Sequence, residues 1–178
     1  MQIMTKLKVL LIAAIVLVAV NLFSTQIEIT PSGPTPIRKL DIVSVTDPPC
    51  MQMYFHIERY ADSFNIPKRY AYGIASAETG YRGPFHWNYN PAQASGAGAV
   101  GPMQIMLETA RRNNRDNVSR EKLRTDIEYN VMTSMKVLRK LHNKYGDWKT
   151  VFGCYNTGRP LINGYAQRVY NHVIDWKR

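Results

Sequence analysis

The segment Ala77-Glu78-Thr79-Gly80, followed later by Gly98-Ala99-Val100-Gly101-Pro102-Met103-Gln104, decides how this sequence is interpreted. The first stretch ends a predicted helix, and Gly80 is a natural stop for it. Residues 80–102 are rich in Gly, Pro, Asn, Ser and aromatic residues, which predicts a long irregular segment. Loops longer than about 15 residues inside a compact domain are usually functional. The sequence therefore places a carboxylate, Glu78, at a helix end beside a candidate functional loop.

The chain from Cys50 onward shows helical periodicity. Apolar or aromatic residues at positions 51, 54, 55, 57 and 61 suit one helical face. Asn65 as a cap and Pro67 in a first-turn position predict the start of a second helix. The fold class predicted is mainly α. The expected helices cover residues 51–64, 67–78, 104–113, 125–144, 148–156 and 165–176.

Glu78 is the candidate for acid–base chemistry. It lies among Ile74, Ala75, Ala77 and Tyr81. A carboxylate near apolar groups is desolvated, and the carboxyl end of a helix adds partial negative charge; both effects raise its pKa. A glutamate kept protonated near neutral pH can act as a general acid. When this stretch is taken alone, a solvent-exposed glutamate at the helix end with no special role is the favoured interpretation.

Short blocks of residues occur along the chain in this order: Ala77-Glu78-Thr79-Gly80, Asn90-Pro91, Ser95, Gly98-Ala99, Gly101, Met103-Gln104, Asn130, Leu138, Tyr155-Asn156-x-Gly158, Tyr165 and Val169. In their order and in the spacing within each block, they resemble the soluble lytic transglycosylase family. The resemblance covers roughly residues 50–176, and any single block would be weak evidence. The sequence departs from the family pattern at Thr79 (usually Ser), Pro102 (Leu), Ser134 (Gly) and Cys154 (Ala), and residues 80–89 form a longer segment.

This resemblance implies a lysozyme-like single catalytic domain that cleaves the glycan strands of peptidoglycan without water. Glu78 would serve as acid and then as base, giving a 1,6-anhydromuramoyl product. The substrate's own N-acetyl group would stabilise the positive centre, so a second carboxylate is not required. No cofactor is implied. A hydrolytic muramidase related to goose-type lysozyme, and a catalytically idle component that binds the cell wall, remain alternatives.

The same resemblance assigns substrate-binding roles to five residues. Each has a simpler alternative: Met103 as core packing, Asn156 as a helix-end contact and Tyr155 as a buried aromatic residue. Phe85, Trp87 and the neighbouring Tyr89 either stack on sugars or hold the long loop. The five expected substrate-binding residues are Ser95, Met103, Gln104, Tyr155 and Asn156.

The amino terminus predicts export. Lys6 and Lys8 precede an apolar run of about 15 residues, shorter than the roughly 20 of a membrane-spanning helix. No clear cleavage site follows, so residues 1–23 are interpreted as a signal peptide or an uncleaved anchor. Residues 24–49 form a Pro-rich linker, and residues 50–178 form the catalytic domain. The domain would then lie in the periplasm, on the outer face of the inner membrane or in the cell envelope.

The net charge is +10, and residues 50–178 hold 19 basic and 10 acidic side chains. Such a domain favours an anionic partner, which includes nucleic acid, acidic membranes and cell-wall polymers. No nucleic-acid-binding motif is present. The resemblance to the transglycosylase family implies peptidoglycan glycan strands as the partner. An uncleaved N-terminal segment would add the membrane. Wall remodelling, a secretion apparatus, a pilus and a bacteriophage assembly are all compatible biological settings.

Neither the cysteines nor the histidines predict a metal site. Cys50 and Cys154 would close a loop of roughly 100 residues if they paired, worth about 4–5 kcal/mol by chain entropy. Two unrelated thiols are the equal alternative. The four histidines, at positions 56, 86, 142 and 172, lack close metal-ligand spacing, so no metal is expected.

Overall fold

The computed structural model describes residues 44 and 46–176. These belong to one compact unit, and the account below concerns that unit alone. The expected signal or anchor segment and most of the linker lie outside the described residues. Within the described part, none of the helices combines the length and apolar character needed to cross a bilayer.

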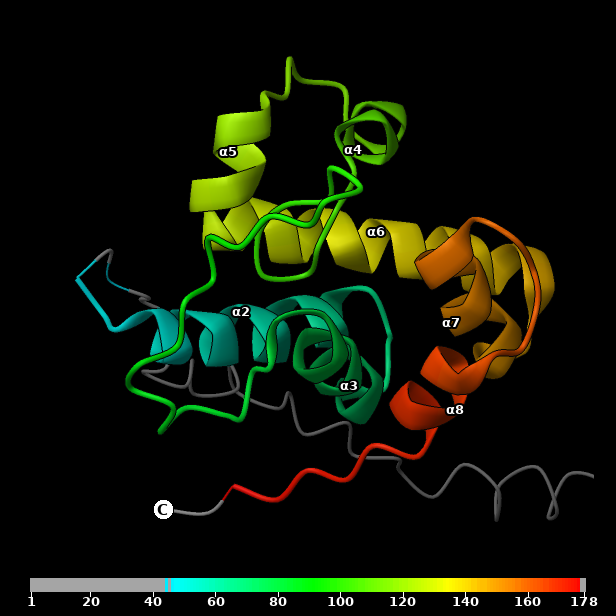
Figure 1. The fold of residues 1–178 in the computed structure, drawn as a ribbon, viewed down its shortest axis with the longest axis horizontal. Helices are drawn as coiled ribbons and strands as arrows, with labels where there is room; N and C mark the ends of the chain where they lie inside the picture. The colour runs from blue at the N-terminus through cyan, green and yellow to red at the C-terminus, as the bar shows by residue number, and fades with distance from the viewer. Residues whose placement is uncertain (1–43, 45, 177–178) are drawn as a thin grey trace, which may run out of the picture. The chain divides into compact units, whose positions relative to one another are not determined.

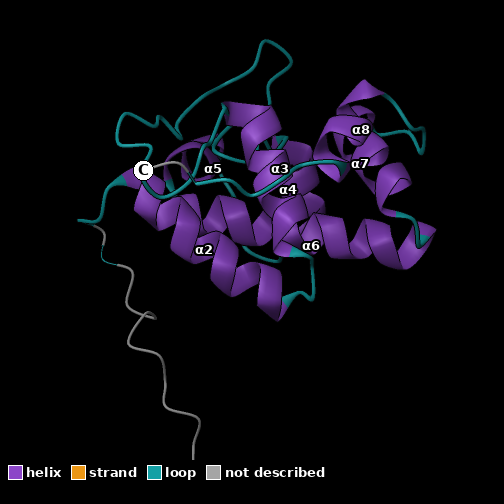
Figure 2. Cartoon of the chain, turned by 90° about the horizontal axis from the view of Figure 1, so that it is seen from below, coloured by secondary structure: helices purple, strands orange, loops and turns teal. Residues whose placement is uncertain are grey.

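The predicted mainly α class is confirmed for the described residues. Their regular structure is helical, and the β structure among them consists of two isolated bridges within the long loop (Figure 2). The helices are α2 (Pro49–Ser63), α3 (Lys68–Thr79), α4 (Leu107–Asn113), α5 (Arg120–Thr125), α6 (Ile127–Tyr145), α7 (Trp148–Thr157) and α8 (Gly164–Tyr170).

Helix α6 is the centre of the packing. Its side chains Val131, Met135 and Leu138 are fully buried, because they recur at helical spacing along one face. In Figure 1, α2 and α3 lie on one side of α6, and α4 and α5 lie on the other. Helix α7 packs at the carboxyl end of α6, and α8 packs against α7 and α3. The end of α3 thereby comes beside α8, which is far away in sequence.

Side-chain caps fix the start of several helices. Asp126 accepts from the Tyr129 amide at the start of α6, and Asn163 accepts from the Ala166 amide at the start of α8. The expected cap at Asn65 is wrong. That residue adopts a left-handed turn with φ of 49°, and α3 begins after Pro67 without a side-chain cap.

Three further helix boundaries correct the sequence prediction. The helix expected from residue 104 begins at Leu107, because Gln104 has a φ of 49° that belongs to a turn. A separate short helix, α5, precedes α6 and was not anticipated. The last helix ends at Tyr170 instead of residue 176, and Val173 beyond it is 74% exposed, so the apolar residues there do not form a core-facing stripe.

The cysteine pair expected as one alternative is not formed, since both thiols are free. Cys50 lies in the first turn of α2, where its carbonyl accepts a hydrogen bond of 2.8 Å from Tyr81 Oη. Cys154 lies on α7 and lines a cavity with Val137 and Leu141 of α6. The two helices bury their cysteines against different neighbours.

Candidate active site

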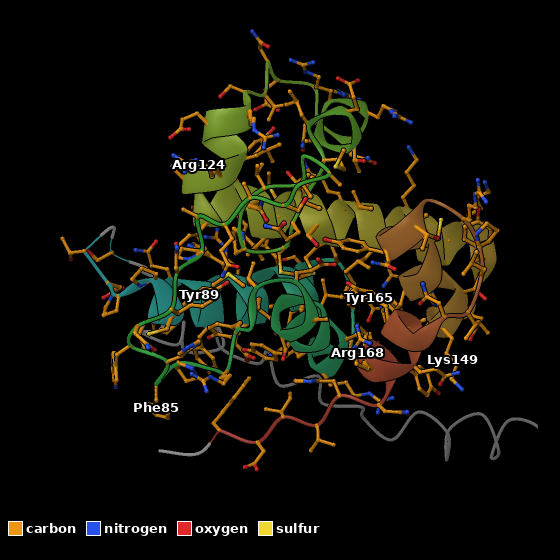
Figure 3. All side chains as sticks on the ribbon, viewed as in Figure 1. Phe85, Tyr89, Arg124, Lys149, Tyr165 and Arg168 are labelled. Atoms are coloured by element: carbon orange, nitrogen blue, oxygen red, sulfur yellow. The ribbon has the colours of Figure 1, made fainter. Side chains whose placement is uncertain are left out.

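Glu78 is the penultimate residue of α3, where Gly80 ends the helix with a left-handed φ of 68°. Its carboxylate is half-buried and turned toward α8. Tyr165 Oη donates a hydrogen bond of 2.6 Å to Glu78 Oε1. Figure 3 shows Tyr165 on the side of α8 that faces α3. The contact between these two helices thus fixes the orientation of the carboxyl group.

Burial raises the pKa of the Glu78 carboxyl above its usual value, and the hydrogen bond from Tyr165 opposes this in part. Burial and the neighbouring Glu78 also raise the pKa of the Tyr165 hydroxyl well above its ordinary range. The Tyr165 hydroxyl therefore stays protonated at neutral pH and can donate to the Glu78 carboxylate. A carboxyl with a raised pKa, held by a permanent donor, suits general acid–base chemistry.

The second oxygen of Glu78, Oε2, has no hydrogen-bond partner among the described residues and is not sealed from solvent. No charged group within the described part of the chain contributes to the pKa shift of Glu78. A second carboxylate is therefore not adjacent there. One oxygen is used for orientation and the other is available for proton transfer.

Thr79 ties the end of α3 to the long loop. Its buried Oγ1 lies 2.9 Å from the Pro102 carbonyl and 2.7 Å from Tyr89 Oη. Because the threonine proton goes to a carbonyl oxygen, Tyr89 is the donor in the second bond. The family pattern usually has a serine at this position, and Thr79 keeps the hydroxyl group. This hydroxyl binds residues 89 and 102 and so anchors both ends of the segment between them.

Asn130 of α6 holds the glycine-rich turn from the inside. Its Oδ1 accepts from the Met103 amide at 2.9 Å, and its Nδ2 donates to the carbonyls of Val100 and Leu123 at 3.0 and 2.8 Å. A Cβ at Gly101 would overlap the Asn130 amide and the Leu123 carbonyl. This close approach, together with a φ of 79°, explains why glycine occupies position 101.

Tyr155 uses its hydroxyl within the protein. It donates to the Met103 carbonyl at 2.7 Å and accepts from Ser134 Oγ at 2.8 Å. Glu78 is close enough to raise the pKa of Tyr155 further, although burial is the larger cause. The hydroxyl is thus committed to holding the loop, and the ring is the part of Tyr155 that can face a ligand. The serine at position 134, a departure from the family pattern, supplies one of these bonds.

The other expected substrate-binding residues differ in their placement. The Met103 side chain is fully buried and belongs to the core. Gln104 Nε2 donates to the Gln93 and Gly101 carbonyls, which shapes the loop. Ser95 is exposed and closes a turn through the Ala99 amide. In this structure, the core packing of Met103 and the hydrogen bonds of Gln104 and Ser95 stabilise the loop.

Asn156 is exposed and accepts a 3.1 Å hydrogen bond from Asn163, which caps α8. With Tyr155 it lines a cavity of about 500 Å³ between α4, α6 and α7, whose walls also carry Arg112 and Lys140. Glu78 does not line this cavity. The cavity provides a surface with aromatic, amide and basic groups next to the tyrosine that holds the loop.

Sequence reasoning gave Tyr165 no role, although it is the direct partner of Glu78. Its match to the closing helix of the family pattern was the available signal. The roles of Asn130 and Ser134 as buried donors and acceptors also emerged only from the packing. Among residues 44 and 46–176 there is no cluster of three or more His, Cys, Asp or Glu side chains that could hold a metal.

These features define a helical domain built around one desolvated carboxylic acid with a fixed orientation. The transglycosylase SLT domain family matches residues 55–175, and the chain belongs to this family. No curated protein sequence gave a match.

Solved structures of a 70-kDa soluble lytic transglycosylase resemble the fold. One, from Escherichia coli, is 25% identical with a TM-score of 0.50, and a complex of such an enzyme with bulgecin A is 25% identical with a TM-score of 0.51. Each alignment covers 65% of this chain and 18% of the other. The chain thus corresponds to less than a fifth of those proteins.

Proposed function

We propose that the protein cleaves the β-1,4 bond between N-acetylmuramic acid and N-acetylglucosamine in peptidoglycan by intramolecular transglycosylation. The observation that carries the proposal is Glu78, a half-buried carboxyl of raised pKa that Tyr165 holds at 2.6 Å. Membership of the transglycosylase SLT domain family supports the same reaction class.

In the first step, protonated Glu78 donates its proton through Oε2 to the glycosidic oxygen while the bond to the anomeric carbon breaks. The electron pair of that bond leaves with the oxygen of N-acetylglucosamine. The acetamido oxygen of the muramoyl sugar stabilises the positive centre, as in substrate-assisted glycosidases. This assistance accounts for a site in which the described residues place no second carboxylate beside Glu78.

In the second step, the Glu78 carboxylate accepts the proton of the muramoyl C6 hydroxyl. The C6 oxygen attacks the anomeric carbon, and a 1,6-anhydro ring forms without water. Glu78 is protonated again, so the site returns to its starting state. Tyr165 donates to Oε1 in both states, and this leaves Oε2 as the oxygen that exchanges protons.

Peptidoglycan as substrate agrees with the basic domain and requires export. We propose that residues 1–23 deliver the domain across the inner membrane, as a signal peptide or as an anchor that keeps it on the outer face. Service in a secretion apparatus, a pilus or a bacteriophage assembly is compatible with such a small enzyme. Partners of that kind are open to direct test by co-purification.

The test uses purified full-length protein and its Glu78→Gln variant with purified peptidoglycan, and identifies soluble products by mass spectrometry. Anhydromuropeptides from the wild type and none from Glu78→Gln are expected. Glu108→Gln, at an exposed position on α4, is the matched control and should retain activity. Products one water heavier would indicate a hydrolytic muramidase. Binding without products would indicate a cell-wall-binding component.

A further inference from the structure

A second cavity, of about 660 Å³, lies between residues 80–89 and the C-terminal segment 171–176. Ser76 of α3 contributes to its wall, and Glu78 does not. These residues are two positions apart, which places them about 200° apart around the helix. The cavity therefore lies on the opposite side of α3 from the catalytic carboxyl.

Close packing at two glycines fixes the C-terminal segment against the rest of the domain. A Cβ at Gly73 would lie 2.9 Å from His172 Cβ, and a Cβ at Gly83 would overlap the Trp176 ring. Trp176 also packs edge-on against Tyr72, with ring centroids 4.9 Å apart. The C-terminal segment thus packs closely on α3 at Gly73 and on the loop at Gly83, so the cavity between the segment and the loop has defined walls.

The aromatic residues of the loop divide into two groups. Tyr81 and Tyr89 are buried, and their hydroxyls bond to the Cys50 carbonyl and to Thr79. These two hold the loop in place. Trp87 is 64% exposed and Phe85 is 38% exposed, and their rings meet edge-on at 6.3 Å on the cavity wall.

Phe85 projects outward from the loop (Figure 3). Because most of the Trp87 side chain is exposed, a role in holding the loop does not explain it. The exposed aromatic surface of Trp87 and Phe85 together favours contact with a ligand.

Polar groups surround these two rings. Arg82, His86, Asn88 and Asp175 line the same cavity. Arg82 can only donate, so its 3.1 Å contact makes His86 Nε2 an acceptor, and the neutral ring carries its proton on Nδ1. That buried Nδ1 has no acceptor among the described residues.

This combination selects the ligand class. The polar side chains on the cavity wall disfavour a wholly apolar ligand, because such a ligand would cover them without offering hydrogen bonds. A pyranose ring has an apolar face of C–H groups and an edge of hydroxyl and amide groups. That pattern matches aromatic faces bordered by donors and acceptors.

We propose that this cavity is a second saccharide site, which binds a β-1,4-linked, N-acetylated amino-sugar segment against Trp87 and Phe85. The choice of sugar rests on the proposed action on peptidoglycan glycan strands. A site on the far side of α3 binds the polymer without occupying the catalytic carboxyl. The enzyme is thereby retained on the glycan between cleavage events.

The test is a titration of the full-length Glu78→Gln protein with a β-1,4-linked N-acetylglucosamine oligomer, observed by NMR at the indole N–H groups. The chain has three tryptophans, so Trp148, which packs against His142 and Phe152 away from the cavity, is an internal control. Saturable shifts of the Trp87 and Trp176 signals, with Trp148 unmoved, are expected. Unmoved Trp87 and Trp176 signals would overturn the proposal. Equal shifts of these signals with a peptidoglycan peptide that carries no sugar would also overturn it.

A pair of variants supplies the second readout, which is retention of the Glu78→Gln protein on insoluble peptidoglycan. Trp87→Ala should weaken retention by roughly three- to tenfold, the loss expected for one stacked aromatic ring. Ile162→Ala removes a similarly exposed apolar side chain, 53% exposed and outside the cavity, and should leave retention unchanged. Equal retention of the two variants would contradict the proposal. Neither readout depends on cleavage, so this site and the catalytic function are tested separately.

Discussion

At the scale of single residues, the burial that raises the pKa of Glu78 also lowers the stability of the fold at neutral pH. The folded protein binds this proton more tightly than the unfolded chain does. The contribution of Glu78 to stability is therefore complete below the unfolded pKa of about 4.3 and is lost as pH rises through the folded pKa. A catalytic carboxyl kept protonated is thus a local source of instability.

We expect Glu78→Gln to raise the free energy of unfolding at pH 7, by about 1.4 kcal/mol for each unit by which the folded pKa is raised. The amide keeps the shape and an oxygen for Tyr165, but it does not ionise. Urea unfolding at several pH values measures the difference, which should disappear below pH ~4. A gain that is the same at every pH would show that Glu78 is not the titrating group.

Tyr165→Phe should reduce kcat/KM and shift the alkaline limb of its pH profile upward. The lost hydrogen bond favours the ionised form of Glu78, so its removal raises the pKa of the carboxyl further. The general acid then remains protonated to higher pH, although it is less well oriented. Initial rates on soluble glycan fragments across pH provide the measurement. A limb that moves to lower pH would contradict this role of Tyr165.

At the scale of elements, the turn at residues 100–103 depends on its fit to α6. We expect Gly101→Ala to lower the free energy of unfolding by roughly 2–4 kcal/mol, because the methyl group displaces Asn130 and φ is positive. Gly146→Ala isolates the second effect, since Gly146 has a φ of 73° with open space around it. It should cost only about 1 kcal/mol. Equal losses in the two variants would mean that the contact with Asn130 is unimportant.

Helix content was predictable from the sequence, whereas several helix ends were not. Apolar periodicity located α2, α3, α6 and α7 within a few residues, because burial of one face dominates their stability. The helix predicted from residue 104 begins three residues later, because Gln104 adopts a left-handed conformation. The last helix ends at Tyr170, before its predicted end at residue 176. Those features follow from tertiary contacts, which periodicity does not report.

The candidate site, like the helices, was predictable where local sequence decides and unpredictable where tertiary packing decides. Glu78 could be singled out because its apolar neighbours along the helix are visible in the sequence. Its partner Tyr165 is 87 positions away, and only the packing of α3 on α8 brings the two together. The substrate-binding roles of Met103 and Tyr155 stay predictions. That the Met103 side chain is enclosed by the core and the Tyr155 hydroxyl is bound on both sides could not be predicted, because these are properties of the packed structure.

At the scale of the whole molecule, residues 50–178 carry nine more basic than acidic side chains. Several of the acidic groups already form surface ion pairs, as Glu58 does with Lys68 and Glu121 with Arg124. Arg124 of α5 and Lys149 of α7 lie at separate edges of the domain (Figure 3). The excess positive charge is thus spread over the surface, which suits long-range attraction to an anionic polymer better than recognition of one small anion.

We therefore expect added salt to slow peptidoglycan cleavage by weakening encounter and leaving the chemical step intact. Screening shortens the reach of surface charges from about 10 Å at 0.1 M salt to about 3 Å at 1 M. The initial rate at low peptidoglycan concentration should fall several-fold over that range, and the rate at saturating peptidoglycan should change little. Lys149 does not contribute to the pKa shift of Glu78. The charge-reversed variant Lys149→Glu should therefore show a lower rate at low salt and a weaker salt dependence than the wild type. If the rates of both proteins were insensitive to salt, the positive charge would have no role in bringing the enzyme to its substrate.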